Sequence, residues 1–256
     1  MSAHAGPKAV TNGLVLELDA GNTKSYPGTG TTWFDLSGNG YHGTLVSSPS
    51  FAASNGGAFT FNGSSNYATL PYAGLLNLGN AFTIQATIKL PDITNITDYT
   101  VVSALDVTNP VVTKGYSFGW QRDLSYALPA KGLRLQLGKS IWAWNLQGSA
   151  QNSIADTNWH NVAVVCSALT TTPIVVFYVD GVASTTSQWS ASPNAAINYA
   201  TTTASVRVAG TYPATLPSYQ TTYSAHVSAD LRIYNRALSA DEILQNFQAH
   251  RGRFGI

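Results

Sequence analysis

Apolar and polar residues alternate along most of the chain with a period of two, the pattern of β-strands that bury one face. In the segment FTIQATIKL, every second residue from Phe82 to Leu90 is apolar and the residues between them are mainly polar. About a dozen such segments are more than one open sheet carries comfortably, so we expect two antiparallel sheets packed face to face. The other predicted strands are Leu14–Asp19, Ala58–Phe61, Tyr67–Leu70, Tyr99–Leu105, Tyr116–Gln121, Leu133–Leu137, Ile141–Leu146, Trp159–Ser167, Ile174–Val179, Ser205–Ala209 and Ala225–Tyr234.

The sequence contains one clear turn signal. Asp180 and Gly181 lie between PIVVFYV and VASTT, and a two-residue type I′ turn needs residue types that tolerate positive φ at both central positions. We predict a β-hairpin there. Stretches rich in Thr, Ser and Pro interrupt the strand pattern elsewhere without changing it, so we interpret them as long loops of one domain.

One helix is predicted, near the C-terminus. Ser239 and Glu242 form a capping-box pattern in LSADEILQNFQAH, and Leu238 precedes the cap, where it can pack against Ile243. We therefore expect residues 240–249 to be helical, with the next three residues closing the helix.

These signals divide the chain into three parts. Residues 1–12 have no strand pattern and are expected to form a flexible arm, residues 13–250 a single domain, and residues 251–256 a tail beyond the helix. We expect the chain ends to dock with a partner, and a symmetric homo-oligomer such as a trimer is one arrangement that the sequence leaves open. The docking candidates are Arg251, Arg253, Phe254 and Ile256.

Charge and hydropathy narrow the classes of partner. Charged residues make up only 10% of the chain and the formal net charge is +1, so nucleic acid and anionic membrane are poor partners. No apolar run has the length of a signal peptide or a membrane span, from which we expect a protein made and kept in the cytoplasm. The single cysteine, Cys166, continues an apolar strand face and cannot form an intrachain disulfide.

Seven short sequence segments occur in a fixed order along the chain, and the ordered set is more specific for a family than any single segment. Together they resemble the laminin-G-like, concanavalin A-like jelly roll, and the resemblance implies an all-β sandwich of two antiparallel sheets. The opening and closing phrases also resemble the version of this domain found in structural proteins of tailed, cyanophage-like bacteriophages. The phrases are GLVLELDAGN, DLSGNGYHGTL, FTFNGSSNYATL, FTIQATIKL, WHNVAVV, VVFYVDGV and DLRIYNRALSADEI.

Glucanases resemble this domain too, but their catalytic pattern is incomplete in this chain. They carry Glu-x-Asp-x-x-Glu on one strand, whereas the only glutamates here are Glu17 and Glu242. The capping box accounts for Glu242, and Glu17 shares a strand face with Asp19 without a third carboxylate. The scattered histidines give no Ser-His-Asp or Cys-His arrangement either. We expect no catalytic residues, and a degenerate glycosidase with Glu17 as its acid is a minor alternative.

The loop FDLSGNGYHG, residues 34–43, is the candidate metal site. Jelly rolls of the resembling kind often bind structural calcium at loop ends, and Asp35 and Asn39 are the candidate ligands. A steric explanation competes with the metal: Gly38 and Gly40 adopt positive φ while Asp35 and Asn39 bond the local backbone as Asx turns. The sequence favours the turn and leaves calcium open.

Aromatic side chains supply the candidate glycan site. Trp142 and Trp144 lie two residues apart on one strand face, and Tyr212 and Tyr219 lie in a loop-rich region. Two tryptophans on one strand face are more often core residues than a sugar platform. The same four residues are therefore candidates for either role.

These observations favour a non-enzymatic structural protein of a phage virion, either a capsid decoration protein or a fibre-associated subunit. It would be localised in the virion, dock with capsid or other virion proteins, and also adhere to cell-surface glycans. The alternative is a lectin-like, carbohydrate-binding module outside any virion. Fold alone does not choose between these functions.

Overall fold

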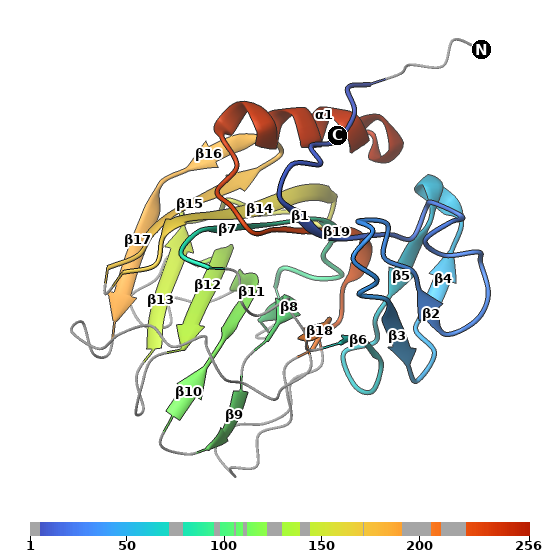
Figure 1. The fold of residues 1–256 in the computed structure, drawn as a ribbon, viewed down its shortest axis with the longest axis horizontal. Coiled ribbons are helices and arrows are strands. Elements are labelled where there is room, and N and C mark those ends of the chain that lie inside the picture. The colour runs from blue at the N-terminus through green and yellow to red at the C-terminus, as the bar shows by residue number, and fades with distance from the viewer. Residues whose placement is uncertain are drawn as a thin grey trace.

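The computed structural model describes residues 6–71, 79–94, 98–104, 106–109, 112–121, 130–138, 144–170, 172–190, 206–210 and 224–256. Two large antiparallel sheets lie face to face, and one helix, α1 (Ala240–Phe254), lies across the outer face of one of them (Figure 1). The predicted all-β jelly-roll sandwich with one C-terminal helix is confirmed.

The eight-stranded sheet has the order β16-β15-β14-β7-β19-β5-β4, and β1 pairs with β19 beside β5. Its centre consists of three long strands that pair along most of their length. The strands are β1 (Leu14–Asp19), β4 (Ser50–Ala52), β5 (Ala58–Thr60), β7 (Phe82–Lys89), β14 (Trp159–Ala168), β15 (Ile174–Val179), β16 (Val182–Ser184) and β19 (Val227–Tyr234).

The nine-stranded sheet has the order β17-β13-β12-β11-β8-β18-β6-β3-β2. A separate pair, β9 (Asp106–Asn109) and β10 (Val112–Lys114), and a short 3₁₀ helix, η1 (Ser54–Gly56), complete the elements. The strands of the large sheet are β2 (Thr32–Trp33), β3 (Gly43–Val46), β6 (Tyr67–Leu70), β8 (Tyr99–Ser103), β11 (Tyr116–Gln121), β12 (Gly132–Gly138), β13 (Trp144–Ser149), β17 (Thr186–Ser190) and β18 (Val206–Val208).

The core between the sheets is rich in aromatic residues. Period-two alternation directs the apolar side chains of both sheets inward, and Cys166 lies among them as a buried free thiol. Burial of this area is the main favourable contribution to folding. The largest fully buried aromatic side chains are Trp33, Trp120, Tyr116, Tyr234, Phe59, Phe61, Phe82, Phe118 and Phe177.

Both local signals in the sequence are confirmed. Asp180 and Gly181 have φ angles of 51° and 79° and join β15 to β16 as a two-residue hairpin. Ser239 accepts a hydrogen bond from the backbone N–H of Glu242, whose side chain accepts one from the backbone N–H of Ser239. Leu238 and Ile243 belong to the same buried cluster beneath α1.

The predicted end of the helix was wrong. Gly252 does not close α1, which continues to Phe254 and ends at Gly255 with a left-handed φ of 72°. The segment 251–256, expected to be a tail, therefore begins as helix. Its last turn is held because Phe254 packs against Trp159, with ring centroids 4.8 Å apart. Among the described residues, no helix is long and apolar enough to cross a membrane.

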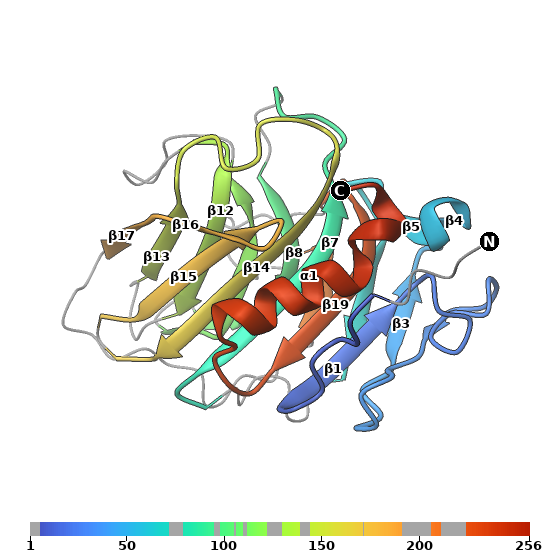
Figure 2. The same ribbon diagram turned by 90° about the horizontal axis from the view of Figure 1, so that it is seen from above.

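The expected flexible arm is also different in its described part, residues 6–12. The backbone N–H of Val10 donates to Asn246 Oδ1 at 2.7 Å, and its carbonyl accepts from Tyr234 Oη at 2.9 Å. Gln245 Nε2 donates to the carbonyl of Lys8 at 2.7 Å. These bonds attach residues 6–12 to α1 and β19, so this segment and the C-terminus both lie on the helix side of the sandwich (Figure 2).

Acid is expected to destabilise the fold through His226. The imidazole is 1% exposed beside Phe61, and burial lowers its pKa from 6.5 to about 4. The unfolded chain then binds a proton that the folded state excludes, so stability that is complete above pH 6.5 is lost as the pH falls toward 4. We expect this residue to account for a loss of about 3 kcal/mol in unfolding free energy.

Urea unfolding at pH 7 and pH 4 measures this effect when the wild type is compared with His226→Gln, which stays neutral at both pH values. The wild type should lose more stability than the variant. Equal losses in the two proteins would remove His226 as the cause.

Candidate functional site

The loop that the sequence singled out is a turn built around Asp35. Its Oδ1 accepts the backbone N–H groups of Glu17 (3.0 Å) and Ser37 (2.9 Å). Its Oδ2 accepts the backbone N–H of Tyr41 (3.1 Å) and the hydroxyl of Ser37 (2.8 Å). Asp35 is 8% exposed, and its Oδ1 joins the loop to β1 through Glu17 while its Oδ2 bonds within the loop.

Asn39 completes the same turn. Its amide nitrogen donates to the carbonyl of Val15 at 2.9 Å, and the neighbouring glycines, Gly38 and Gly40, have φ angles of 90° and 77°. Asp35 thus forms the expected Asx turn with Ser37 and the glycines adopt the expected positive φ, whereas Asn39 bonds β1 and not the local backbone. Within the described ranges, no group of three or more His, Cys, Asp or Glu residues is placed to hold a metal ion. Calcium at Asp35 and Asn39 stays a prediction from the sequence.

Three of the four aromatic candidates for glycan binding lie outside the described residues, and of the fourth only the backbone is described. Trp142, Tyr212 and Tyr219 lie outside the described residues. Trp144 begins β13, where it pairs with Gly138, but the description there is confined to its backbone. A role for these four residues in sugar binding remains a prediction.

The C-terminal docking candidates have partners within the fold. Arg253 donates to Asp19 Oδ1 at 2.7 Å and to the carbonyls of Asn55 and Gly57, both at 3.1 Å. The other three also have contacts: Phe254 is buried, Ile256 packs beside it, and the Arg251 guanidinium lies over an α1 phenyl ring. Arg253 and Phe254 therefore stabilise the domain instead of extending from it.

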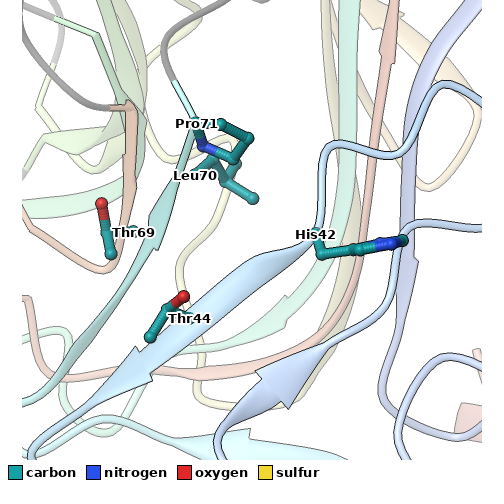
Figure 3. Close-up of a pocket in the computed structure, with 5 residues that line it drawn as sticks. All are labelled: His42, Thr44, Thr69, Leu70 and Pro71. Atoms are coloured by element: carbon teal, nitrogen blue, oxygen red, sulfur yellow. The ribbon is translucent and has the colours of Figure 1, made fainter.

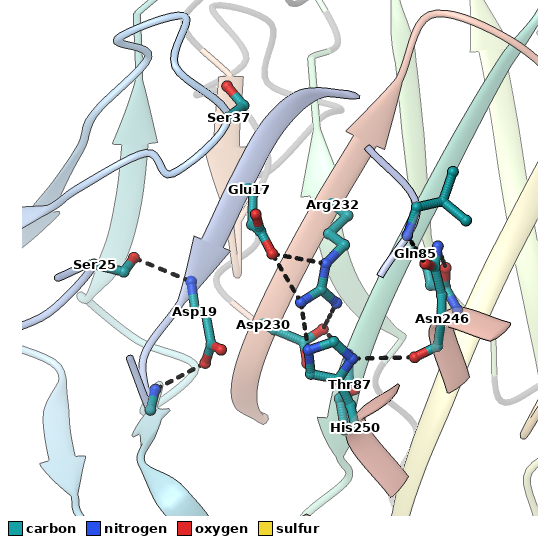
Figure 4. Close-up of polar contacts among 12 residues, drawn as sticks. Glu17, Asp19, Ser25, Ser37, Gln85, Thr87, Asp230, Arg232, Asn246 and His250 are labelled. Carbon is teal, nitrogen blue, oxygen red and sulfur yellow. Dashed lines mark hydrogen bonds and ion pairs between the residues drawn. The ribbon is translucent and has the colours of Figure 1, made fainter. Parts of the chain in front are cut away.

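The candidate glycosidase acid, Glu17, is part of an ion pair under α1. Its Oε1 accepts from Arg232 Nε at 3.1 Å, and Arg232 Nη2 donates to His250 Nε2 at 2.7 Å (Figure 4). Asp19, on the same strand, is bonded to Arg253. The two carboxylates thus compensate two guanidinium groups beneath the helix, which is a structural arrangement.

The contacts of His160 and Cys166 also indicate structural roles. Burial opposes protonation of His160, but its hydrogen bonds to Asp180 (2.8 Å) and Asp156 (3.0 Å) outweigh burial and raise its pKa. Burial raises the pKa of the Cys166 thiol to about 12, far from the range of a reactive thiolate. Neither residue forms a nucleophile and base pair in the described part of the chain.

A row of mainly polar side chains crosses the outer face of the nine-stranded sheet, one from each of eight adjacent strands. Their positions follow from register, because residues paired across antiparallel strands share a face. In the strands other than β13, the inward neighbours of these residues belong to the core. This polar row consists of Thr32, Thr44, Thr69, Arg207, Ser103, Ser117, Gln136 and Leu146.

Exposure along the polar row rises toward β2 and β3. Ser103 and Ser117, in the middle, are 1% and 3% exposed, whereas Thr32 is partly exposed and Thr44 is exposed. A shallow pocket of about 280 Å³ opens at this accessible end (Figure 3). We call it the β3–β6 pocket, and its lining residues are His42, Thr44, Thr69, Leu70 and Pro71.

Two arginines lie on the same outer face. The Arg207 guanidinium is stacked over the Tyr67 ring, 4.2 Å from its centroid. Arg134 Nη1 donates to Asp98 Oδ2 at 2.6 Å. The face therefore combines hydroxyl groups, two guanidinium groups and one partly buried tyrosine ring, residue types that also occur in sites for polar ligands such as sugars.

Sequence reasoning did not identify the polar row or the pocket. Alternation in Tyr67–Leu70 and Val206–Val208 predicts which residues face outward. It does not say that β6 and β18, far apart in the chain, are neighbours. The site depends on that pairing.

Comparison with known proteins agrees with the fold. The sequence model of a family described as the Concanavalin A-like lectin/glucanases superfamily matches residues 62–244. A search of curated proteins found no significant relative.

Solved structures with a similar fold include two botulinum neurotoxin proteins. The binding domain of botulinum neurotoxin DC, in complex with rat synaptotagmin II, has a TM-score of 0.66, 13% identity, and coverage of 94% of this chain and 52% of that one. The second is a structure of botulinum neurotoxin type C, a toxin whose cell entry depends on interaction with two ganglioside molecules. It has a TM-score of 0.64 and 13% identity, and the match covers 94% of this chain and 52% of that one. The chain thus spans about half the length of these structures.

An enzyme is also among the similar structures. A mutant of Trypanosoma rangeli sialidase with trans-sialidase activity has a TM-score of 0.60 and 15% identity over 98% of this chain and 35% of that one. Identities this low show a shared fold and nothing further about activity.

Proposed function

The chain belongs to the concanavalin A-like lectin/glucanase superfamily, and on that premise we propose that it is a non-enzymatic, lectin-like module that binds glycans. The observation that carries the proposal is the β3–β6 pocket, which opens at the accessible end of the polar row. Its volume of about 280 Å³ is just below the roughly 300–1,000 Å³ typical of small-molecule sites, a size suited to one sugar residue.

The chemistry of the pocket supports a sugar ligand. Within the described part of the chain, the hydroxyls of Thr44 and Thr69 make no hydrogen bond, so both are available to a ligand. His42 Nδ1 accepts the backbone N–H of Asp35 at 3.1 Å, which places the remaining ring proton on Nε2. Pro71, which is exposed, adds apolar surface of the kind that the faces of sugar rings contact.

The similar structures support binding over catalysis. One of the neurotoxin structures is a binding domain in complex with synaptotagmin II, and cell entry of the type C toxin depends on interaction with two ganglioside molecules, which are glycolipids. Glu17, the candidate acid for hydrolysis, has an arginine partner under α1. A degenerate glycosidase is therefore not the function we propose.

A role in a phage virion is compatible with glycan binding. The only support for that role is the resemblance of the sequence to phage structural proteins. A decoration or fibre-associated subunit could adhere to host glycans through the same pocket. The internal contacts of Arg253 and Phe254 mean that docking to other virion proteins would use other surfaces.

Glycan binding should weaken when the pocket hydroxyls are removed. We expect Thr44→Val and Thr69→Val each to raise the Kd for a bound glycan by about tenfold, the effect of losing one hydrogen bond. A glycan array identifies the ligand, and calorimetric titration measures the Kd. Thr60→Val, at an exposed threonine of β5 in the other sheet, is the matched control. No binding to any glycan at millimolar concentration would overturn the proposal.

A further inference from the structure

The side chains beside the β3–β6 pocket indicate the length of the glycan that it binds. Resting on the glycan-binding function proposed above, we propose that the site takes an oligosaccharide of at least two sugar residues. The first residue occupies the pocket, and the second lies beyond His42 with the apolar face of its ring on the Phe34 side chain. Strand register, the exposure of Phe34 and the contacts of His42 support this assignment.

Strand register places a second row of side chains beside the threonines of the polar row. Those threonines lie side by side because β2, β3 and β6 pair in register. Two residues along the chain from each threonine is a larger side chain, which by alternation leaves the sheet on the same face, about 6–7 Å away. This second row, which we call the Phe34 row, consists of Phe34, His42 and Pro71.

Two observations agree with this register. The rings of Phe34 and His42 meet edge to face, with their centroids 5.3 Å apart. His42 and Pro71 both line the β3–β6 pocket. The Phe34 row therefore starts at Pro71 in the pocket, passes His42, and ends at Phe34 outside it.

Phe34 is accessible to a ligand. Among the described residues, four large apolar side chains are exposed, and Phe34 is the aromatic one, with 39% of its surface accessible. A sugar ring has a face of C–H groups, which an aromatic ring can cover, and hydroxyl groups around its edge, which threonine hydroxyls can bond. The Phe34 row and the threonines beside it match these two kinds of surface.

His42 separates the pocket from Phe34. Its Nδ1 accepts the backbone N–H of Asp35 at 3.1 Å and its ring contacts Phe34, so two contacts hold the imidazole in one orientation. Figure 3 shows the ring extending away from Thr44 and Thr69. Because the pocket holds one sugar residue and Phe34 lies on the far side of this ring, a second sugar residue is needed to cover Phe34.

The experiment compares glycans of different length. The best oligosaccharide from a glycan array is titrated by calorimetry beside each of its component monosaccharides. We expect the oligosaccharide to bind about tenfold more tightly than the better monosaccharide, the effect of covering one aromatic face. Phe34→Ala should remove this length preference and leave the affinity for the monosaccharide unchanged, which also shows that the pocket in the variant is intact.

Further variants separate ring stacking from other effects. Phe34→Tyr keeps the ring and should keep the length preference, whereas Phe34→Leu keeps an apolar side chain without a ring and should lose most of it. Leu244→Ala, at an α1 residue with the same exposed fraction of 39%, should change neither affinity. In proton NMR spectra, C–H protons of the second sugar residue should shift upfield in the wild-type complex and not in the Phe34→Leu complex.

The outcomes distinguish the second sugar position from glycan binding itself. If the oligosaccharide and the monosaccharide bind equally, the second position is overturned and glycan binding stands. If the length preference survives Phe34→Ala, or if that variant weakens binding of the monosaccharide by the same factor, the assignment to Phe34 is overturned. If no glycan binds, the proposed function fails.

Discussion

Arg232→Met is expected to lower the free energy of unfolding by about 3–5 kcal/mol, the cost of removing one partner from a buried ion pair. Arg232 is 1% exposed and lies between β1 and α1. Its guanidinium donates to Glu17 at 3.1 Å and lies 3.5 Å from Asp230, whose side chain is fully buried. Without the arginine, Asp230 retains a buried negative charge with no cation beside it.

A matched surface pair provides the control. Arg236 pairs with Glu242 at 2.6 Å, but both side chains are more than a quarter exposed, so Arg236→Met should cost about 1 kcal/mol or less. Adding Asp230→Asn to Arg232→Met should recover part of the loss, because it removes the uncompensated charge and can keep an oxygen for the backbone N–H of Thr87. Equal losses for the two arginine variants would contradict a buried network.

Gly21→Ala is the second substitution with a large expected effect. A Cβ atom at this position would overlap the carbonyl oxygen of Gly56 and the guanidinium of Arg253. The loop would have to move away from η1 and disturb the three acceptors that Arg253 bridges, which connect α1 to β1 and β5. We expect a loss of about 3 kcal/mol or more in unfolding free energy, measured by urea denaturation.

A second glycine provides the control for whether the loss of stability comes from steric overlap at Gly21 or from replacing any glycine by alanine. Gly252 lies inside α1 with open space where its Cβ would be. Gly252→Ala should therefore stabilise the protein by about 0.5–1 kcal/mol, since alanine is the better helix former. A destabilised Gly252→Ala protein, or a Gly21→Ala protein as stable as the wild type, would contradict this explanation.

Local signals in the sequence predicted much of the fold. Leu14–Asp19, Tyr67–Leu70, Tyr116–Gln121 and Ile174–Val179 are strands with the predicted bounds. Most of them alternate, and Ile174–Val179 is a short apolar run that ends at the Asp180-Gly181 turn. The hairpin at Asp180 followed from backbone preferences that two residues are enough to specify.

Tertiary contacts decided the parts that were wrong. Gly252 is a poor helix former, but burial of Phe254 and the three bonds of Arg253 carry the helix beyond it. The N-terminal arm is held although it has no strand pattern, because its backbone bonds side chains such as Asn246 and Tyr234 instead of a neighbouring strand. Neither effect is visible in a local window of sequence.

The candidate site was less predictable than the fold. Asp35 and Asn39 were noticed because glycine-rich loops are conspicuous, and they form a turn. Thr69 and Arg207 are ordinary outward residues in two short strands, and only the sheet order brings them together. A single sequence contains the alternation but not the order of the strands.

Because the C-terminus lies beside α1 (Figure 1), and Thr44 and Thr69 of the β3–β6 pocket belong to the other sheet, the molecule has a natural orientation for attachment. A biotin or affinity tag fused at the C-terminus would hold the protein on a sensor surface with the pocket directed toward the flowing solution. Random coupling through lysines would not give that uniform presentation, since Lys8, Lys24, Lys89 and Lys131 lie in different parts of the chain.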